Sequence, residues 1–430
     1  MSTIETLKKD FEHYRAQADN SAFAEQREAA FGELQTLGIP TTKHEEWKYT
    51  NLKFINDIPF QASCVHTEAA RKYYSEHIVQ TLKANRLVFI NGSFDATLTQ
   101  IQPEDEGNII ITNLAWARRN HAAIFDAHFG KYAEVKGNAM NAMNTALMSD
   151  GAFVYVPAGK QTTFPIIITN VSDASEVNVL IQPRNLIVVE KNASATVIES
   201  FFEMGSNASF CNIVNEVYVG ENANLEHYKL QRQQGEHYQN NFTQVFQEAN
   251  TNINQVTLTL DGKFVRNTLH FYMNGQNCNT LLYGLYLLDG NQFVDNHTRV
   301  DHAQPNCFSD EKYKGILKDK STAVFNGKIM VHLDAQKTNA YQRNQNILLS
   351  DDATVNTKPQ LEIFADDVKC THGATVGQLD EEPIFYLRSR GISENVARKL
   401  LLNAFADDIA AKIKIPELVA ILEEQIEKKI

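Results

Sequence analysis

The chain has 430 residues, enough for a large buried core, and its 52 acidic against 40 basic residues give a net charge of −12. This balance argues against a nucleic-acid binder, because phosphate recognition rests on a basic surface. No apolar run is long enough to cross a bilayer, and the amino terminus is typical of a charged amphipathic helix rather than a signal peptide, so we expect a cytoplasmic protein.

The N-terminal region, residues 1–85, is predicted to hold helices followed by a connector. Apolar residues recur at helical spacing until Gly38 and Pro40 stop the pattern. They are Ile4, Leu7, Phe11, Tyr14, Phe23, Phe31, Leu34 and Leu37. Residues 41–52, TTKHEEWKYTNL, then embed aromatic side chains among polar ones. We expect this connector to pack against the body of the protein.

The core is predicted to span residues 86–377 and to be rich in β-strands, with some helix near residues 113–148. Strand-like sequence begins at RLVFING, residues 86–92. From Ala152 onward, β-branched and aromatic residues alternate between short turns rich in Asn, Gly and Asp, and helical periodicity disappears. A stretch of this length needs one large all-β architecture.

The turns of this core repeat at a fixed interval. Asn192, Asn207 and Asn222 are each 15 residues apart, and so are Asp351 and Asp366. A short fixed period in strand-rich sequence indicates a β-solenoid, in which each turn buries its apolar side chains on its neighbours. Asn and Asp suit the corners because they tolerate the left-handed conformation. A β-sandwich with similar hairpin turns is the competing interpretation.

Residues 378–430 are predicted to form a helical module. Asp380 is placed to cap a first helix, and Gly391 to end it. Ser393 opens a second helix and Pro416 starts a third. Their apolar residues are Val396, Leu400, Phe405, Ile409, Ile413, Leu418, Leu422, Ile426 and Ile430. This surface either docks another protein or packs on the solenoid itself, and the pattern alone favours neither.

The segment VKCTHGATVG, residues 368–377, carries the main candidate for a metal site. In a strand, residues two apart face the same side, so Cys370 and His372 would present a thiol and an imidazole to one surface. Both are ligands for iron or zinc, and a thiolate beside a histidine is also a nucleophile. The competing interpretation is a buried structural cysteine. Two ligands cannot close a tetrahedral site, so further ligands would come from distant residues or another chain.

The other potential ligands are scattered. Five cysteines, without a C-x-x-C pair, indicate neither a disulfide framework nor a zinc knuckle. They are Cys64, Cys211, Cys278, Cys307 and Cys370. The histidines of the β region lack ligand spacing, and we expect each to be a satisfied core or surface residue. They are His227, His237, His297, His302 and His332.

Two acidic pairs, Asp351–Asp352 and Asp366–Asp367, suggest another class of protein. Glycoside hydrolases use paired carboxylates, and several sugar-cleaving enzymes are β-helices. Both pairs occupy the same place in the repeat, however, which favours a role at the corners. No Walker lysine motif, G-x-G-x-x-G or G-x-S-x-G occurs, so a standard nucleotide loop and an α/β hydrolase are not indicated.

Several blocks together resemble the SufB/SufD family of iron–sulfur cluster assembly scaffold proteins. The main block is VKCTHGATVGQLDEEPIFYLRSRGI, residues 368–392, continued by ARKLLLNAFADDI. It is preceded by NGKIMVHLDAQKTNAYQRNQNILLSDDATVNTKPQLEIFADD, and KHEEWKYTNL lies near the amino terminus. The residues around Cys370 and those of the connector are similar to the corresponding segments of the SufD branch of the family. A SufB chain would be longer and carry glutamate and threonine around that cysteine.

The resemblance implies a right-handed parallel β-helix flanked by helical domains, and a scaffold subunit rather than an enzyme. SufB would pair with it through the β-helix, and the ATPase SufC would dock on the C-terminal helices. His372 would be an iron or cluster ligand and Cys370 would lie at the SufB interface, so that a transient iron–sulfur cluster is shared. SufC dimerisation on ATP binding would open this interface. A flavin in the complex is also implied by the family, although no flavin motif is present.

Two alternatives stay open at this stage. The chain could be a SufB-type scaffold, or one that pairs with itself, and use Cys370 directly to carry sulfur, since related subunits share one interface. More distantly, it could be a β-helical carbohydrate-active enzyme that uses the aspartate pairs.

Overall fold

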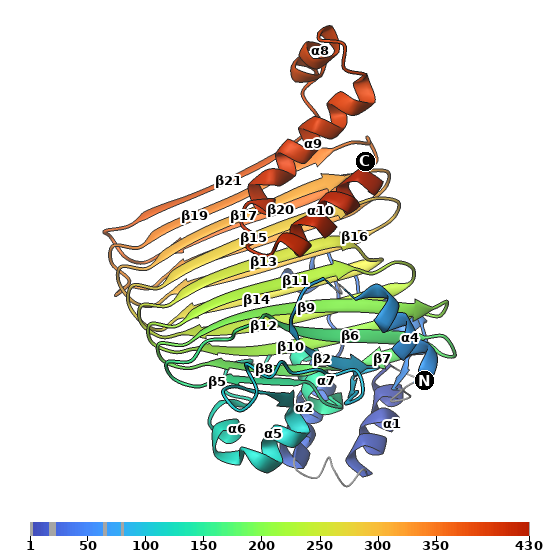
Figure 1. Ribbon diagram of the computed structural model, residues 1–430, viewed down its shortest axis with the longest axis vertical. Helices are drawn as coiled ribbons and strands as arrows, with labels where there is room; N and C mark the ends of the chain where they lie inside the picture. Colours follow the sequence, from blue (N-terminus) through green and yellow to red (C-terminus); the bar gives the residue numbers. More distant parts are fainter. Residues whose placement is uncertain (1–2, 17–22, 63–66, 79–80, 430) are drawn as a thin grey trace.

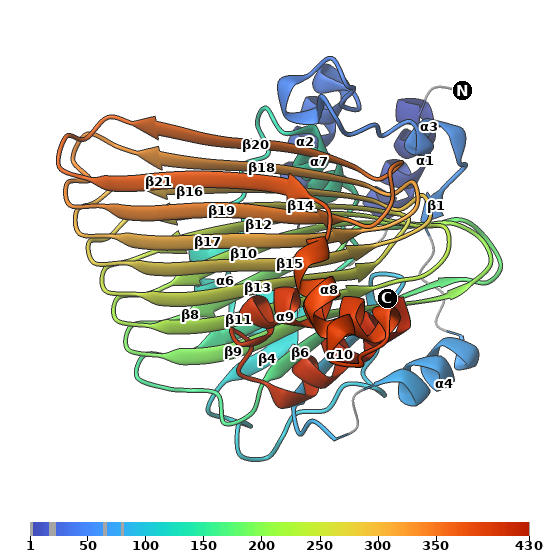
Figure 2. The ribbon, with the colours of Figure 1, turned by 90° about the horizontal axis from the view of Figure 1, so that it is seen from above.

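The body of the protein is a parallel β-solenoid of about eight turns, seen in a computed structural model that describes residues 3–16, 23–62, 67–78 and 81–429 (Figures 1 and 2). From β8 onward each turn contributes one strand to each of two sheets, so strands two apart in the sequence are hydrogen-bonded neighbours. The pairs from β5 and β6 onward are parallel. The predicted β-solenoid is confirmed, and the β-sandwich built from hairpins is wrong.

The first sheet, which we call sheet A, runs in the spatial order β20-β18-β16-β14-β12-β10-β8-β5-β4, with β7 also paired to β10 and β1 paired to β7. Its strands are β1 (Gln61–Ala62), β4 (Ile110–Asn113), β5 (Ala152–Val156), β7 (Val179–Ile181), β8 (Arg184–Val189), β10 (Ser209–Val219), β12 (His237–Gln247), β14 (Phe264–Met273), β16 (Phe293–His302), β18 (Thr322–Val331) and β20 (Thr354–Ile363).

The second sheet, sheet B, runs in the order β21-β19-β17-β15-β13-β11-β9-β6-β2-β3. Its strands are β2 (Asn85–Ile90), β3 (Ser93–Phe94), β6 (Ile166–Ala174), β9 (Ser194–Gly205), β11 (Asn224–Arg232), β13 (Asn252–Asp261), β15 (Asn279–Leu288), β17 (Phe308–Leu317), β19 (Asn339–Leu348) and β21 (Lys369–Gly377). The largest apolar cluster lies between the sheets and includes Leu87, Val154, Val217, Leu282 and Phe325.

The 15-residue spacing of the sequence is half a turn of the solenoid. Asn192 and Asn222 precede strands of sheet B, whereas Asn207 between them precedes a strand of sheet A. Successive repeats therefore lie at opposite corners, not at the same place. At the sheet B corner the asparagines are left-handed and stacked, and the Nδ2 of Asn222 donates to the Oδ1 of Asn192 at 3.0 Å. This ladder contains Asn192, Asn222, Asn250, Asn277 and Asn306.

Helices from the N-terminal half cover the outside of the first turns (Figure 1). They are α1 (Thr3–Ala16), α2 (Ala24–Leu37), a short 3-10 helix (Glu45–Trp47), α3 (Phe54–Asp57), α4 (Glu68–His77), α5 (Leu114–Asn120), α6 (Ala122–His128) and α7 (Ala139–Leu147). Gly38, with a φ of 68°, ends α2 as predicted. Of the predicted helical face, Leu7, Phe11, Phe31 and Leu34 are buried and Leu37 is exposed, while the side chains of Ile4 and Tyr14 lie outside the described part.

Three C-terminal helices follow the last strand: α8 (Glu381–Ser389), α9 (Glu394–Ala410) and α10 (Pro416–Lys429). The predicted cap is present, because the Asp380 carboxylate accepts from the Glu382 N–H at 3.0 Å, and Gly391 has a φ of 85°. Helices α9 and α10 pack on the outer face of sheet B through Leu402, Ile409, Leu418, Leu422 and Ile426. Figure 1 shows α8 lying beyond the last turn.

Candidate functional site

Cys370 and His372 lie on β21, the last strand of sheet B (Figure 1). In register, Cys370 is aligned with Ala340 and His372 with Gln342 on the turn before. Both partners are buried, and aligned residues of parallel strands point to the same side. The predicted thiol and imidazole therefore share the inward face of the strand. Among the described strands none follows β21 in the sheet, so this face lies at the open end of the solenoid.

The surroundings of the two side chains differ. Cys370 is half-buried and packs on the apolar cluster of Ile329, Val331 and Ala340, and this burial raises the pKa of its thiol. His372 is exposed. The described residues contain no group of three or more His, Cys, Asp or Glu side chains arranged to hold a metal ion. The described part of the chain thus presents two candidate ligands and no complete site.

Two buried polar residues beneath His372 were missed by sequence reasoning. Gln342 lies one turn earlier and Glu311 two turns earlier in the same row of sheet B. The Nε2 of Gln342 donates to the Oε2 of Glu311 at 2.8 Å. Burial raises the pKa of Glu311 to about 7. Their only sequence signal is the turn-length spacing from His372, which is meaningful only once the register is known.

The acidic pairs occupy exposed turns at opposite ends of one strand. Asp351–Asp352 precede β20 and Asp366–Asp367 follow it. A strand of that length separates the two pairs by about 33 Å, several times the distance between the carboxyl groups of a glycosidase. Their place at corners is confirmed, although the corners are different ones.

The histidines of the β region all lie against neighbouring polar groups, but the prediction that each is satisfied does not hold for His227 and His302, whose buried Nδ1 atoms have no hydrogen-bond partner among the described residues. His227 Nε2 lies 2.9 Å from Glu199 Oε1, and His302 Nε2 lies 2.9 Å from Ser309 Oγ. His237 Nδ1 lies 2.6 Å from Ser209 Oγ. His332 Nε2 lies 3.1 Å from Asp301 Oδ1, and His297 Nε2 lies 3.0 Å from Asp295 Oδ1. Burial lowers the pKa of His237 to about 4 and that of His302 to about 3. These two are neutral structural residues.

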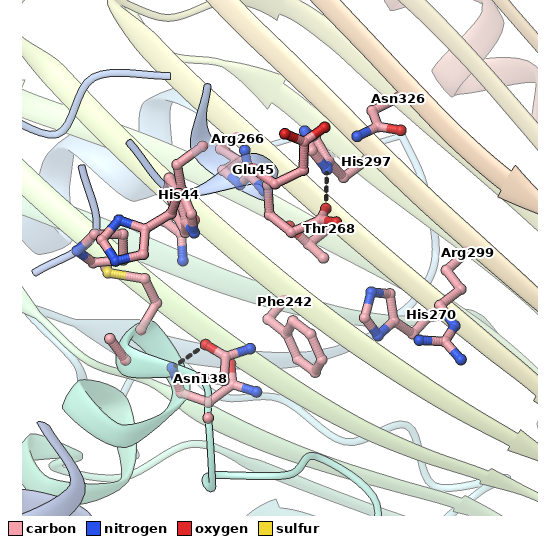
Figure 3. A pocket seen from close by; sticks show the side chains of 18 of the residues that line it. His44, Glu45, Asn138, Phe242, Arg266, Thr268, His270, His297, Arg299 and Asn326 are labelled. Atoms are coloured by element: carbon pink, nitrogen blue, oxygen red, sulfur yellow. Dashed lines mark hydrogen bonds and ion pairs between the residues drawn. The ribbon is translucent and has the colours of Figure 1, made fainter. Parts of the chain in front are cut away.

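The connector lies on the outer face of sheet A, beside a cavity of about 440 Å³ (Figure 3). Trp47 lies over the Arg266 guanidinium, with 3.9 Å between the guanidinium carbon and the ring centroid. Arg266 and Thr50 both donate to the Asp295 carboxylate, and His297 contacts the same group. Because Trp47 and Thr50 of the connector contact Arg266 and Asp295 of sheet A, we interpret these residues as the structural contacts that hold the connector on the sheet. The predicted packing of the connector is confirmed.

Two of the scattered cysteines are neighbours in space. Cys278 and Cys307 occupy the same corner on consecutive turns of sheet B, where the Phe308 N–H donates to the Cys278 carbonyl at 2.8 Å. Both thiols are buried and donate to the Gly275 carbonyl. The turn length was the signal that could have paired them. Cys211 is buried, and Cys64 lies outside the described residues.

The apolar surface of the C-terminal module is divided between two environments. Ile409 and Leu422 are buried against sheet B, so the packing interpretation holds for one face. A second group is exposed on α8 and the start of α9. It comprises Phe385, Tyr386, Val396 and Leu400, which we call the α8–α9 patch and of which Phe385 is 73% exposed. Ile430 lies outside the described residues.

Two family models match the chain. The SufBD core domain of SUF system FeS cluster assembly matches residues 170–405, and the SufBD protein N-terminal region matches residues 3–168. The chain belongs to the SufBD family of iron–sulfur cluster assembly proteins. The family predicted from the sequence blocks is thus confirmed. No helix of the described residues is long and apolar enough to span a membrane.

Full-length SufBD relatives align with nearly the whole chain. A SufBD family iron–sulfur cluster assembly protein of Synechocystis is 34% identical over 93% of this chain and 89% of its own length. SufD of Escherichia coli is 30% identical over 94% and 92%, and SufD of Bacillus subtilis is 26% identical over 92% of each. The SufD-like sequence motifs agree with these similarities.

Proposed function

We propose that this SufBD chain is a non-enzymatic scaffold subunit that pairs with SufB through the last turn of its solenoid. The open edge of β21 carries the proposal. An exposed edge strand presents unpaired N–H and C=O groups to another chain, and proteins usually blunt such edges with proline or lysine. The edge of sheet A has both in the middle of β20, as Lys358 and Pro359, whereas β21 has a lysine only at its first position, Lys369, no proline, and two glycines, Gly373 and Gly377.

The same end of the solenoid would hold the nascent cluster. Cys370 and His372 face inward from β21, and the paired subunit would supply the ligands that they lack. Iron or the cluster is then a transient cargo at the interface, with His372 as a ligand and Cys370 as an interface thiol. Exposed apolar residues surround this end and would be covered by pairing. They are Leu333, Ile363, Phe364 and Val376.

The α8–α9 patch would dock the ATPase SufC. Phe385 and Tyr386 are exposed on α8, and Val396 and Leu400 continue the surface on α9. Because α9 also packs on sheet B, a force applied to the patch during the ATP cycle would reach the solenoid.

The division into a helical region to residue 85, a core to 377 and a helical domain beyond stays a prediction. So do a cytoplasmic location and a flavin in the complex.

A scaffold that pairs with itself, or acts as a SufB-type subunit with Cys370 as the sulfur carrier, remains the second candidate. The half-buried thiol of Cys370 at an open edge favours it. A carbohydrate-active enzyme is not proposed, because the strand β20 separates the two aspartate pairs.

Anaerobic co-expression with SufB and SufC, purified on a tag carried by this chain, tests the main proposal. We expect both partners to copurify with a cluster absorption band that His372→Ala weakens strongly while the complex stays assembled. Thr371→Ala, on the same strand but facing the other side, is the matched control and should keep the band. Normal cluster formation in His372→Ala would reject the ligand role. A homodimer without SufB would favour the second candidate.

The docking of SufC is tested by Phe385→Ser combined with Leu400→Ser. We expect SufC to be lost from the purified complex and SufB to be retained, because the patch lies on helices and not on the edge strand. Leu37→Ser, at an exposed leucine on α2, is the control for the general effect of replacing an exposed leucine by serine outside the patch. Retention of SufC in the double variant would reject the α8–α9 patch as its docking surface.

A further inference from the structure

A row of inward-facing side chains runs beneath His372. In sheet B, His372 is aligned with Gln342 on the preceding turn, and Gln342 with Glu311 on the turn before that. Aligned residues on neighbouring strands lie about 4.8 Å apart and point to the same side. His372 is therefore the outer end of a polar row that continues into the solenoid.

Glu311 and the opposite wall hold the Gln342 amide in place. The buried Nε2 of Gln342 donates to Glu311 Oε2 at 2.8 Å. Across the interior, on β18, a Cβ added to Gly327 would lie 2.4 Å from the same Nε2 and 2.7 Å from the Gln342 Cδ. A glycine inside a strand often marks a close approach of another group, and here that group is the amide. Both contacts fix the direction of the amide.

The amide oxygen of Gln342 is left without a partner. Gln342 Oε1 is buried, and no described residue donates to it. Because Nε2 is turned toward Glu311, the oxygen on the other arm of the planar amide is turned away from Glu311. His372 lies on the turn at that side. A buried acceptor without a donor is unfavourable, so the arrangement favours an N–H group that approaches from the last turn.

We propose that Gln342 is a positioning residue for His372, and that its Oε1 accepts a hydrogen bond from one imidazole N–H when the ring, which is exposed in this structure, turns toward it. This contact fixes the tautomer of His372 and leaves the other ring nitrogen unprotonated, as a metal ligand must be. Glu311 acts one step further away by holding Gln342. The inference rests on the proposed function of His372 as an iron or cluster ligand.

The tautomer of His372 in the protein alone tests the inference, because it is read without metal or partner. Histidine rings labelled with ¹⁵N are observed by NMR at pH 8, and the His372 signals are identified by their loss in His372→Ala. We expect one tautomer in roughly tenfold excess, the preference given by one hydrogen bond. Gln342→Met removes the acceptor and should return the ratio to that of free histidine.

Two further variants separate positioning from general damage to the interior. Asn344→Leu also removes a buried amide from β19, but Asn344 is aligned with Ala374, so the His372 tautomer should not change. Gly327→Ala displaces the Gln342 amide without removing it and should lower the tautomer preference. This variant keeps the test decisive if Gln342→Met does not fold.

A free-histidine ratio in the unmodified protein would overturn the inference, and so would an unchanged ratio in both Gln342→Met and Gly327→Ala. The proposed function is judged separately by cluster formation. If His372→Ala forms clusters normally while the native His372 shows one fixed tautomer, the ligand role fails and the positioning contact stands. If the ligand role holds and the tautomer is mixed, only the inference fails.

Discussion

The two ends of the solenoid are built from the same repeat and finished in different ways. At the first end, the short antiparallel strands β3 and β4 close the two sheet edges, and helices cover the outer face. At the last end, β20 and β21 are edge strands of full length, and nearly every residue of β21 is exposed. Short edges and covering elements are how proteins prevent unwanted strand pairing.

This difference separates stability from function along one architecture. The covered end contains fully buried side chains and a buried ion pair, so substitutions there should lower the free energy of unfolding by several kcal/mol. The open end contains the two candidate ligands on a strand that adds little burial, so substitutions there should affect assembly and cluster chemistry. Three predictions test this contrast and one tests the buried Glu311 behind the open end, in order from the largest expected effect on stability to the smallest.

The first prediction compares two phenylalanines at the two ends. Phe153 in β5 is fully buried beneath α6, with its ring 6.3 Å from that of Phe125, and Phe364 after β20 is 60% exposed. Phe153→Ala should lower the free energy of unfolding by about 4 kcal/mol. Phe364→Ala should change it by less than about 0.5 kcal/mol. Urea unfolding measures both, and equal losses would mean that the last turn is already covered in the free protein.

The second prediction compares two ion pairs. Arg184 and Glu216 are buried with 2.7 Å between their charged atoms, whereas Lys328 and Glu362, at the same separation near the open end, are partly exposed. Arg184→Met leaves the buried Glu216 carboxylate with backbone N–H donors but without its cationic partner, and should lower the free energy of unfolding by about 3 kcal/mol. Lys328→Met should lower it by less than about 1 kcal/mol. A large loss from Lys328→Met would contradict the contrast.

The third prediction concerns pH. Burial raises the pKa of Glu311 to about 7 in the folded protein, above its ordinary value of 4.5. The folded state therefore retains a proton that the unfolded state loses, and the contribution of Glu311 to stability falls as pH rises from about 4.5 to 7. The total change is on the order of 3 kcal/mol. Glu311→Gln should remove this fall, as followed by unfolding at pH 5 and pH 8. An identical pH dependence in Glu311→Gln would show that Glu311 is ionised when folded.

The smallest effects are expected at the corners. Asn277 has a φ of 57° and donates to Asn250 Oδ1 at 3.0 Å, so Asn277→Ala should lower the free energy of unfolding by about 1 kcal/mol. Near the open end the left-handed corner residue is Lys337, with a φ of 60°. Lys337→Asn should stabilise the protein by about 0.5 kcal/mol. Thermal unfolding compares the two, and destabilisation by Lys337→Asn would show that the lysine has a contact worth more than the corner preference.

The sequence by itself determined the local features of this protein. Strand alternation and corner residues at a fixed interval indicated a solenoid, because left-handed corners and buried faces leave a repeat in the residues themselves. The Asp380 cap, the Gly391 stop and the common face of Cys370 and His372 followed from the dihedral preferences and periods of single elements. These features depend on residues close together along the chain.

Tertiary structure alone decided what lies across turns. The sequence does not show that the 15-residue interval is half a turn of the solenoid. It therefore did not predict that the thiols of Cys278 and Cys307 are neighbours, or that Glu311, Gln342 and His372 form one row. The C-terminal helices likewise gave one apolar pattern, which the fold divided between a packed face and the α8–α9 patch. Which strands stack, and in which register, is set by packing between residues far apart in the sequence, and local preferences carry no record of it.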